Sequence, residues 1–134
     1  MRTLFLDTAF IIALEDADDQ NHDKATHYWE QFKKEPHKLI TTTYVFDETI
    51  TLLKRRLGFV KASSVGEMLL GSSLMEIVHV SQEDFYKGWE IFLKYKDKGY
   101  SFTDCISFFV MRKTHIKEAL TFDVHFRQTG YKIL

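Results

Sequence analysis

Residues 3–8 have the sequence Thr-Leu-Phe-Leu-Asp-Thr, a short apolar run that ends abruptly at a carboxylate. No polar residue alternates with the apolar ones, as would be expected of a strand with one solvated face, so this pattern predicts a strand buried on both faces. A sheet buried on both faces is a parallel sheet covered by helices. We therefore expect an α/β fold in which Asp7 stands at the carboxyl end of the first strand, where open parallel sheets bind ligands.

The remaining sequence continues the alternation of strands and helices. Further strands are predicted at residues 38–42, 74–80 and 118–122, and residues 131–134 are a candidate fifth strand. Helices are predicted over residues 8–14, 21–34, 44–57, 59–70, 81–98 and 103–115. This order predicts a single α/β domain over residues 1–134, with a mainly parallel sheet of four to five strands and helices on both faces.

Composition supports a globular domain and excludes several classes of protein. Hydrophobic residues make up 45% and charged residues 28% of the 134 residues, which excludes intrinsic disorder. Twelve of the residues are Phe, so a Phe-rich core is expected. A formal net charge of -1 argues against a protein that coats nucleic acid non-specifically, because such binding needs an excess of positive charge.

Cysteine usage and hydropathy predict the compartment. Cys105 is the only cysteine and the N-terminal residues do not form a signal peptide, which together predict a cytoplasmic protein. No apolar run approaches the roughly 20 residues that a membrane-spanning helix needs, so no contact with a membrane is expected.

Four carboxylates are predicted to gather at one edge of the sheet. Asp7 follows the first strand and Asp123 follows the fourth; Glu48 and Asp104 lie in the first turns of two helices. Two carboxylates about 4 Å apart repel by about 4 kcal/mol at an effective dielectric constant of 20, so such a cluster calls for a cation. Oxygen ligands favour Mg²⁺ or Mn²⁺, and zinc is disfavoured because the chain lacks Cys/His ligand spacing. Such an ion can activate water for attack on a phosphodiester.

Each of these carboxylates also has an ordinary structural explanation. Asp7 could cap the helix that follows it, and Glu48 could be a solvated surface residue. Asp104 could be an acid favoured by the helix dipole, and Asp123 could form an Asx-turn. Only the joint placement of all four at one sheet edge favours a metal site.

Four motifs resemble those of the PIN-domain family, and specifically its VapC-type toxin branch. They are Asp7-Thr8 after the first strand, Phe46-Asp47-Glu48 at a helix start, Ser101-Phe102-Thr103-Asp104-Cys105, and Thr121-Phe122-Asp123-Val124-His125-Phe126 followed by Gly130. The resemblance spans Leu4 to Ile133, and the last two motifs are its most specific part.

The resemblance implies a Mg²⁺- or Mn²⁺-dependent endoribonuclease that cleaves RNA phosphodiester bonds. In this branch the enzyme is the toxin of a type II toxin–antitoxin pair and acts on transfer or ribosomal RNA. Many members are homodimers inhibited by a small antitoxin whose C-terminal segment enters the cleft, and others act instead in ribosomal RNA maturation or decay.

The resemblance also assigns the site residues. Its acidic site comprises Asp7, Glu48, Asp104 and Asp123, and its supporting hydroxyls belong to Thr8, Ser101 and Thr121. Asp47 is an alternative to Glu48, but the apolar register of its helix favours Glu48 because it places Asp47 nearer the buried flank.

Basic residues are needed to contact an RNA backbone. Arg55 lies on the same helical face as Glu48 and is the first candidate. The others are Lys54, Arg56, Arg112 and Lys113, although solvated helix faces also explain such residues.

Single residues suggest or disfavour several other functions. Cys105 could be a nucleophile with His125 or His115 as its base, and a non-catalytic module that binds RNA or a partner would use the acids only as caps. A phospho-acceptor receiver domain is disfavoured because Leu6 leaves Asp7 without an acidic neighbour. An Asp-x-Asp phosphatase is disfavoured because Ala9 occupies the second position.

Overall fold

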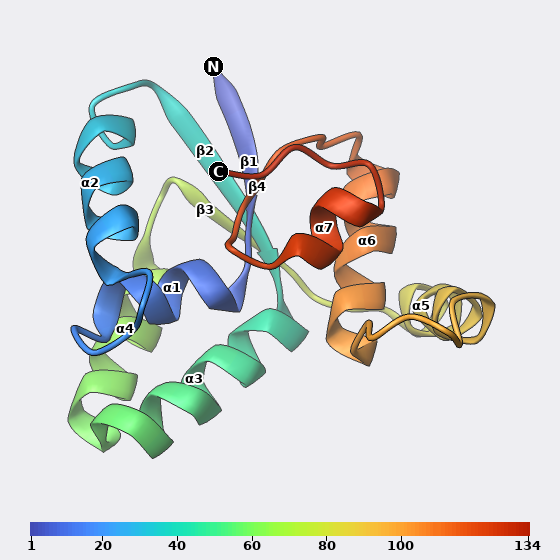
Figure 1. Ribbon diagram of the computed structural model, residues 1–134, viewed down its shortest axis with the longest axis horizontal. Coiled ribbons are helices and arrows are strands. Elements are labelled where there is room, and N and C mark those ends of the chain that lie inside the picture. Colours follow the sequence, from blue (N-terminus) through green and yellow to red (C-terminus); the bar gives the residue numbers. More distant parts are fainter.

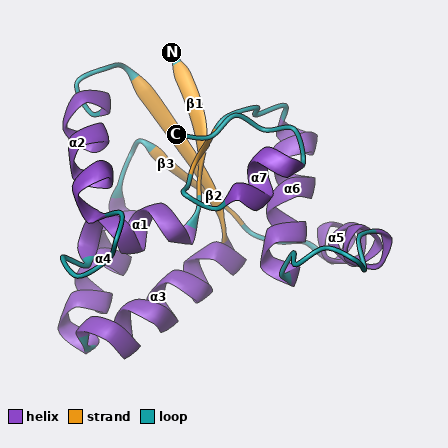
Figure 2. Cartoon of the chain, in the orientation of Figure 1, coloured by secondary structure: helices purple, strands orange, loops and turns teal.

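Four parallel strands form a sheet in the order β3-β2-β1-β4 (Figures 1 and 2). The computed structural model describes residues 1–134. The strands are β1 (Arg2–Leu6), β2 (His37–Thr42), β3 (Met75–Val78) and β4 (Ala119–Leu120). Within β1, Phe5 is paired with Ile40 on one side and with Ala119 on the other. The apolar run at the start of the chain is therefore a central strand, as its composition predicts.

Seven helices cover the two faces of this sheet. They are α1 (Thr8–Glu15), α2 (His22–Phe32), α3 (Thr43–Leu57), α4 (Phe59–Gly71), α5 (Gln82–Lys94), α6 (Phe102–Thr114) and α7 (Val124–Gln128). In Figure 1, α1, α2 and α4 lie on one side of the sheet, and α5, α6 and α7 lie on the other. The α/β architecture with helices on both faces is thus confirmed. None of the helices combines the length and apolar composition that crossing a bilayer requires.

Successive side chains of β1 point to opposite faces of the sheet, and both faces are apolar and buried from Leu4 to Leu6. Leu4 and Leu6 belong to the core on the α1/α2/α4 side, whereas Phe5 belongs to the core on the α6/α7 side. Each of the three side chains is at most 4% exposed. Including Phe5, five phenylalanines are buried in these cores, which confirms the expected contribution of Phe to the core: Phe5, Phe10, Phe32, Phe108 and Phe126.

The C-terminal segment differs most from the sequence prediction. The predicted strand over residues 118–122 is reduced to Ala119–Leu120, because the side chains of the next residues are hydrogen-bonded into a turn. That turn leads into α7, a short helix that periodicity did not reveal. Residues 131–134 do not form a fifth strand and contribute only an isolated bridge between Lys132 and Glu118. The predicted helix over residues 81–98 ends earlier, at Lys94.

Helices α5 and α6 pack closely through a glycine. A Cβ added to Gly88 would clash with Cδ1 of Ile106, a fully buried residue, and would lie 3.1 Å from its Cγ1. The absence of a side chain at position 88 therefore sets the distance between the two helices, and with it the position of α6.

We predict that Gly88→Ala lowers the free energy of unfolding by about 1 kcal/mol, because overpacking outweighs the gain in helix propensity. In an Ile106→Val background, which lacks the clashing Cδ1 atom, the same substitution should be neutral or stabilising. Urea unfolding of the four proteins of this double-mutant cycle measures the difference. An equal cost in both backgrounds would show that the contact does not limit the packing.

Candidate active site

The four predicted carboxylates line one cleft of about 500 Å³ at the carboxyl end of the sheet. Asp7 follows β1, Glu48 projects from α3, Asp104 lies in the first turn of α6, and Asp123 is the N-cap of α7. Thr8 and Ser101 line the same cleft. Residues from four separate parts of the chain therefore converge where the parallel sheet was expected to place its site.

A buried threonine connects two of the acids. Thr121 Oγ1 donates a hydrogen bond to Asp7 Oδ2 at 2.7 Å and accepts one from the backbone N–H of Asp123 at 3.0 Å. Asp7 occupies the N-cap position of α1, yet its side chain makes no capping hydrogen bond. The capping explanation of the Asp7 side chain is therefore wrong, and its carboxylate is held for the cleft instead.

Asp104 both caps α6 and belongs to the site. Its backbone N–H donates to Ser101 Oγ at 3.0 Å, and Ser101 N–H donates to Asp104 Oδ2 at 3.2 Å, which forms a capping box. The same Oδ2 lies 3.0 Å from His125 Nδ1. A role in starting the helix therefore does not keep the Asp104 carboxylate out of the cleft.

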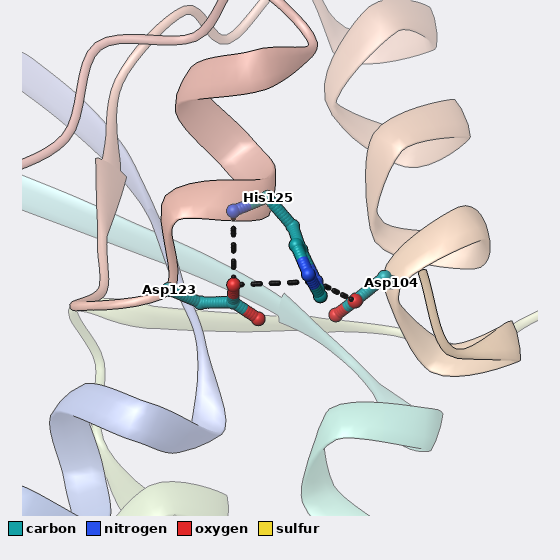
Figure 3. Close-up of side chains that lie close together, drawn as sticks. All are labelled: Asp104, Asp123 and His125. Atoms are coloured by element: carbon teal, nitrogen blue, oxygen red, sulfur yellow. Dashed lines mark hydrogen bonds and ion pairs between the residues drawn. The ribbon is translucent and has the colours of Figure 1, made fainter. Parts of the chain in front are cut away.

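Asp123 lies beside His125, whose imidazole ring contacts two of the acids (Figure 3). The backbone N–H of His125 donates to Asp123 Oδ1 at 2.9 Å, and His125 Nδ1 lies 3.3 Å from that oxygen. One potential ligand atom from each of Asp104, Asp123 and His125 lies within 4.8 Å of the others, a grouping that could hold a metal ion. In the sequence, His125 is part of the Thr121–Phe126 motif and a candidate base for Cys105, but it was not predicted as a site residue; the Asp-x-His spacing in that motif was the available signal.

Glu48, and not Asp47, lies in the cleft. Glu48 is half-buried and lines it, whereas Asp47 is exposed to solvent outside it. The prediction from the apolar register that Asp47 lies nearer the buried flank of the helix is wrong, because Asp47 is exposed. The buried face of α3 is formed by Val45, Thr49 and Leu53.

Thr8 and Thr49 fix α1 against α3. Their hydroxyl oxygens are 3.1 Å apart, and both residues are buried. Glu48 immediately precedes Thr49 in α3, so this contact sets the position of Glu48 relative to Asp7 at the start of α1.

Burial makes this cleft electrostatically costly. The pKa of Asp7 is raised to about 7, mainly by burial; the hydrogen bond from Thr121 opposes this rise, and the charges of Asp104, Glu48 and Asp123 add to it. Burial also raises the pKa of Glu48 and that of Asp104. No lysine or arginine forms an ion pair with any of the four carboxylates. Protons or a cation must therefore offset their repulsion.

The donor atoms suit a hard divalent cation. Asp7 Oδ1, Asp104 Oδ1 and Asp123 Oδ2 accept no hydrogen bond from the protein, and none of them is sealed away from the cleft. Carboxylate oxygens are the preferred ligands of Mg²⁺ and Mn²⁺. The residues present thus fit such an ion.

Of the basic residues singled out in the sequence, Arg56 lines the cleft, where it lies 3.6 Å from both Asp16 and Asp19. Lys54 and Arg55 are exposed outside it. The Arg112 guanidinium lies over the Phe109 ring, and Lys113 pairs with the buried Asp84 at 2.8 Å. The structure therefore favours Arg56 over the other four as a cation near the carboxylates.

Cys105 does not belong to the site. It is fully buried in α6, it does not line the cleft, and burial raises the pKa of its thiol to about 11. A buried thiol that stays protonated cannot act as a nucleophile at neutral pH, so the cysteine-nucleophile hypothesis is wrong.

Comparison with known proteins identifies the family. The sequence profile of the PIN domain matches residues 4–132. The 23S rRNA-specific endonuclease VapC20 of Mycobacterium tuberculosis is 35% identical over 128 residues, which cover 96% of this chain and 95% of VapC20. A VapC ribonuclease of Archaeoglobus fulgidus is 31% identical over 90 residues, 66% of this chain and 56% of that protein.

Solved structures agree with these sequence matches. The crystal structure of VapC20, described as a toxin that cleaves the sarcin-ricin loop, superposes with a TM-score of 0.87 at 34% identity and covers 96% of this chain and 95% of that one. VapBC2 of Rickettsia felis shares the fold, with a TM-score of 0.69 at 14% identity and coverage of 98% of this chain and 97% of that one. The chain therefore belongs to the PIN-domain family, within its VapC-type branch of toxin ribonucleases.

Proposed function

We propose that this protein is a Mg²⁺- or Mn²⁺-dependent endoribonuclease that acts as the toxin of a type II toxin–antitoxin pair, with ribosomal RNA as its substrate class. The observation that carries the proposal is the cleft in which Asp7, Glu48, Asp104 and Asp123 converge without a basic ion-pair partner. The substrate class follows the 35% identity to an endonuclease specific for 23S rRNA.

In this proposal, Asp7, Asp104 and Asp123 hold the cation through the oxygens that accept no hydrogen bond from the protein. When bound, a divalent ion of this kind supplies an activated water and neutralises the charge of a phosphodiester. Glu48, which lines the same cleft, orients the attacking water or completes a second cation site. Thr121 and Ser101 keep the carboxylates in place through the hydrogen bonds described above.

Arg56 is proposed to contact the RNA backbone. It lines the cleft and stands in the last turn of α3 with Lys54 and Arg55, so three consecutive basic residues end the helix that also carries Glu48. A basic helix end beside an acidic cleft attracts a polyanion to the edge of the site while the cation neutralises its centre.

The proposal includes two protein partners. VapC20 is described as a toxin, and a ribonuclease that is toxic to its own cell requires an inhibitor, for which a small antitoxin that enters the cleft is proposed. A homodimer is also proposed, as the resemblance to the family implies.

We predict that Asp104→Asn reduces RNA cleavage at least about 100-fold, because it removes a ligand charge while an amide oxygen can still accept from Ser101 N–H. Asp47→Asn, which removes the same charge from an exposed neighbour of Glu48, should keep full activity. Cleavage is measured with purified protein, Mg²⁺ and ribosomal RNA fragments, and excess EDTA should stop it without unfolding the protein. Normal cleavage by Asp104→Asn, or in EDTA, would overturn the nuclease assignment.

We predict that cation binding strengthens as the pH rises to about 7, because the proton on Asp7 must leave before its carboxylate can bind a cation. The raised pKa also affects stability in the absence of metal. The contribution of Asp7 to the free energy of unfolding is fully present below pH 3.8, the ordinary pKa of the group, and is lost as the pH rises to about 7. Added Mn²⁺ should therefore raise the Tm more at pH 8 than at pH 5.5, and Asp7→Asn should remove most of this difference. An equal rise in Tm at both pH values would contradict the account.

Toxicity provides a cellular test. Expression of the protein should arrest bacterial growth, and Asp7→Ala should relieve the arrest because one cation ligand is lost. Growth curves after induction, with the soluble protein level measured by immunoblot, give the result. Equal arrest by the wild-type protein and a well-expressed Asp7→Ala variant would exclude the metal site as its cause.

A further inference from the structure

His125 is a cleft side chain to which the proposed mechanism gives no role. Its ring lies edge-on to Tyr100, with ring centroids 5.1 Å apart, and its side chain is 28% exposed. Nδ1 points at the two carboxylates of the grouping in Figure 3, 3.0 Å from Asp104 Oδ2 and 3.3 Å from Asp123 Oδ1. The ring thus bridges α7 and the first turn of α6.

The direction of these hydrogen bonds follows from their chemistry. Once Asp104 and Asp123 are ionised, as cation binding requires, they have no proton to donate, so the proton of the hydrogen bond to Asp104 is then on Nδ1 of the imidazole. Asp104 Oδ2 accepts from Nδ1 and from Ser101 N–H, and Asp123 Oδ1 accepts from the backbone N–H of His125, with Nδ1 close by. One oxygen of each carboxylate is therefore fixed, and the other accepts no hydrogen bond from the protein.

The same division is found at Asp7, where Thr121 fixes Oδ2 and leaves Oδ1 without a protein donor. In Figure 3 the second oxygens of Asp104 and Asp123 point toward the space between the two side chains. Without a donor between them, two neighbouring carboxylates would rotate apart to reduce their repulsion. A donor hydrogen-bonded to one carboxylate and 3.3 Å from the other adds to the backbone donors that hold them and opposes this rotation.

We infer that His125 is a positioning residue whose Nδ1–H orients the Asp104 and Asp123 carboxylates for cation binding. The inference rests on the proposed function for its metal but concerns a residue outside the predicted acidic set. A direct ligand role is less suited to this ring, because Nδ1 already faces two carboxylates and Mg²⁺ prefers oxygen ligands. Loss of a group that orients metal ligands in this way typically lowers metal affinity about 10–100-fold.

Four substitutions separate the possible roles of the ring. Asn places an amide N–H close to the position of Nδ1, whereas Gln places it near that of Nε2, and Ala removes the donor altogether. Asp offers an oxygen to a cation but no proton to its neighbours when ionised. His27→Asn, on the exposed face of α2 and outside the cleft, is the matched control.

Mn²⁺ binding, measured by the loss of the free-ion EPR signal, and the kinetics of RNA cleavage are the two readouts. We expect His125→Asn to stay within about threefold of wild type, and the Ala, Gln and Asp variants to lose about 10–100-fold in Mn²⁺ affinity and in kcat. KM for RNA should change little, because the backbone contacts are made elsewhere. Thermal melts by circular dichroism confirm that each variant is folded.

Several results would overturn the inference. If the His125→Ala variant binds Mn²⁺ and cleaves RNA as the wild type does, the ring is dispensable. If the His125→Asn variant behaves like His125→Ala, Nδ1–H is not the group that orients the carboxylates. If the His125→Asp variant binds Mn²⁺ as tightly as the His125→Asn variant does, residue 125 is a direct ligand of the cation. Wild type that binds Mn²⁺ but leaves RNA intact overturns the proposed function alone, since the binding series still tests His125. Wild type that binds no Mn²⁺ overturns both.

Discussion

The mutual repulsion of four carboxylates in one partly buried cleft is the constraint on which the site depends. Burial and neighbouring negative charge raise the pKa of Asp7 to about 7, and no lysine or arginine pairs with Asp7, Glu48, Asp104 or Asp123. A protein gains nothing in stability from such an arrangement. It is explained if a divalent cation supplies the missing charge, and the family to which the chain belongs agrees with this explanation.

The groups that shape the local fold are the same groups that orient the acids. Ser101 and Asp104 close the capping box of α6, and the Asp123 side chain caps α7, so two of the carboxylates are held by the hydrogen bonds that begin two helices. Thr121 connects Asp7 to the backbone of Asp123 immediately after β4. Capping is therefore compatible with the proposed role of these residues in the cleft: one oxygen of Asp7, Asp104 and Asp123 accepts a hydrogen bond from the backbone or a neighbouring side chain, and the other accepts none from the protein.

Much of this could be predicted from the sequence. The apolar run before Asp7 identifies a central parallel strand, and because parallel strands end at the same edge, it also predicts where the acids meet. The predictions that were wrong concern hydrogen bonds and packing that the periodicity of apolar residues does not reveal. β4 is only two residues long because Thr121 begins a hydrogen-bonded turn. Helix α3 packs against α1, α4 and α6, so its apolar register was a poor guide to the position of Asp47. Arg56 lines the cleft and Arg55 does not, a difference in side-chain direction that the spacing of the basic residues does not fix.

The central claim is that the oxygens of Asp7, Asp104 and Asp123 that accept no hydrogen bond from the protein converge on one divalent cation. The most direct test is a crystal structure of the protein grown with Mn²⁺, with anomalous diffraction used to locate the ion. We expect an anomalous peak in the cleft within bonding distance of Asp104 and Asp123, with Asp7 as a direct or water-mediated ligand. A cleft without a peak at saturating Mn²⁺, or a peak bound elsewhere on the protein, would contradict the account.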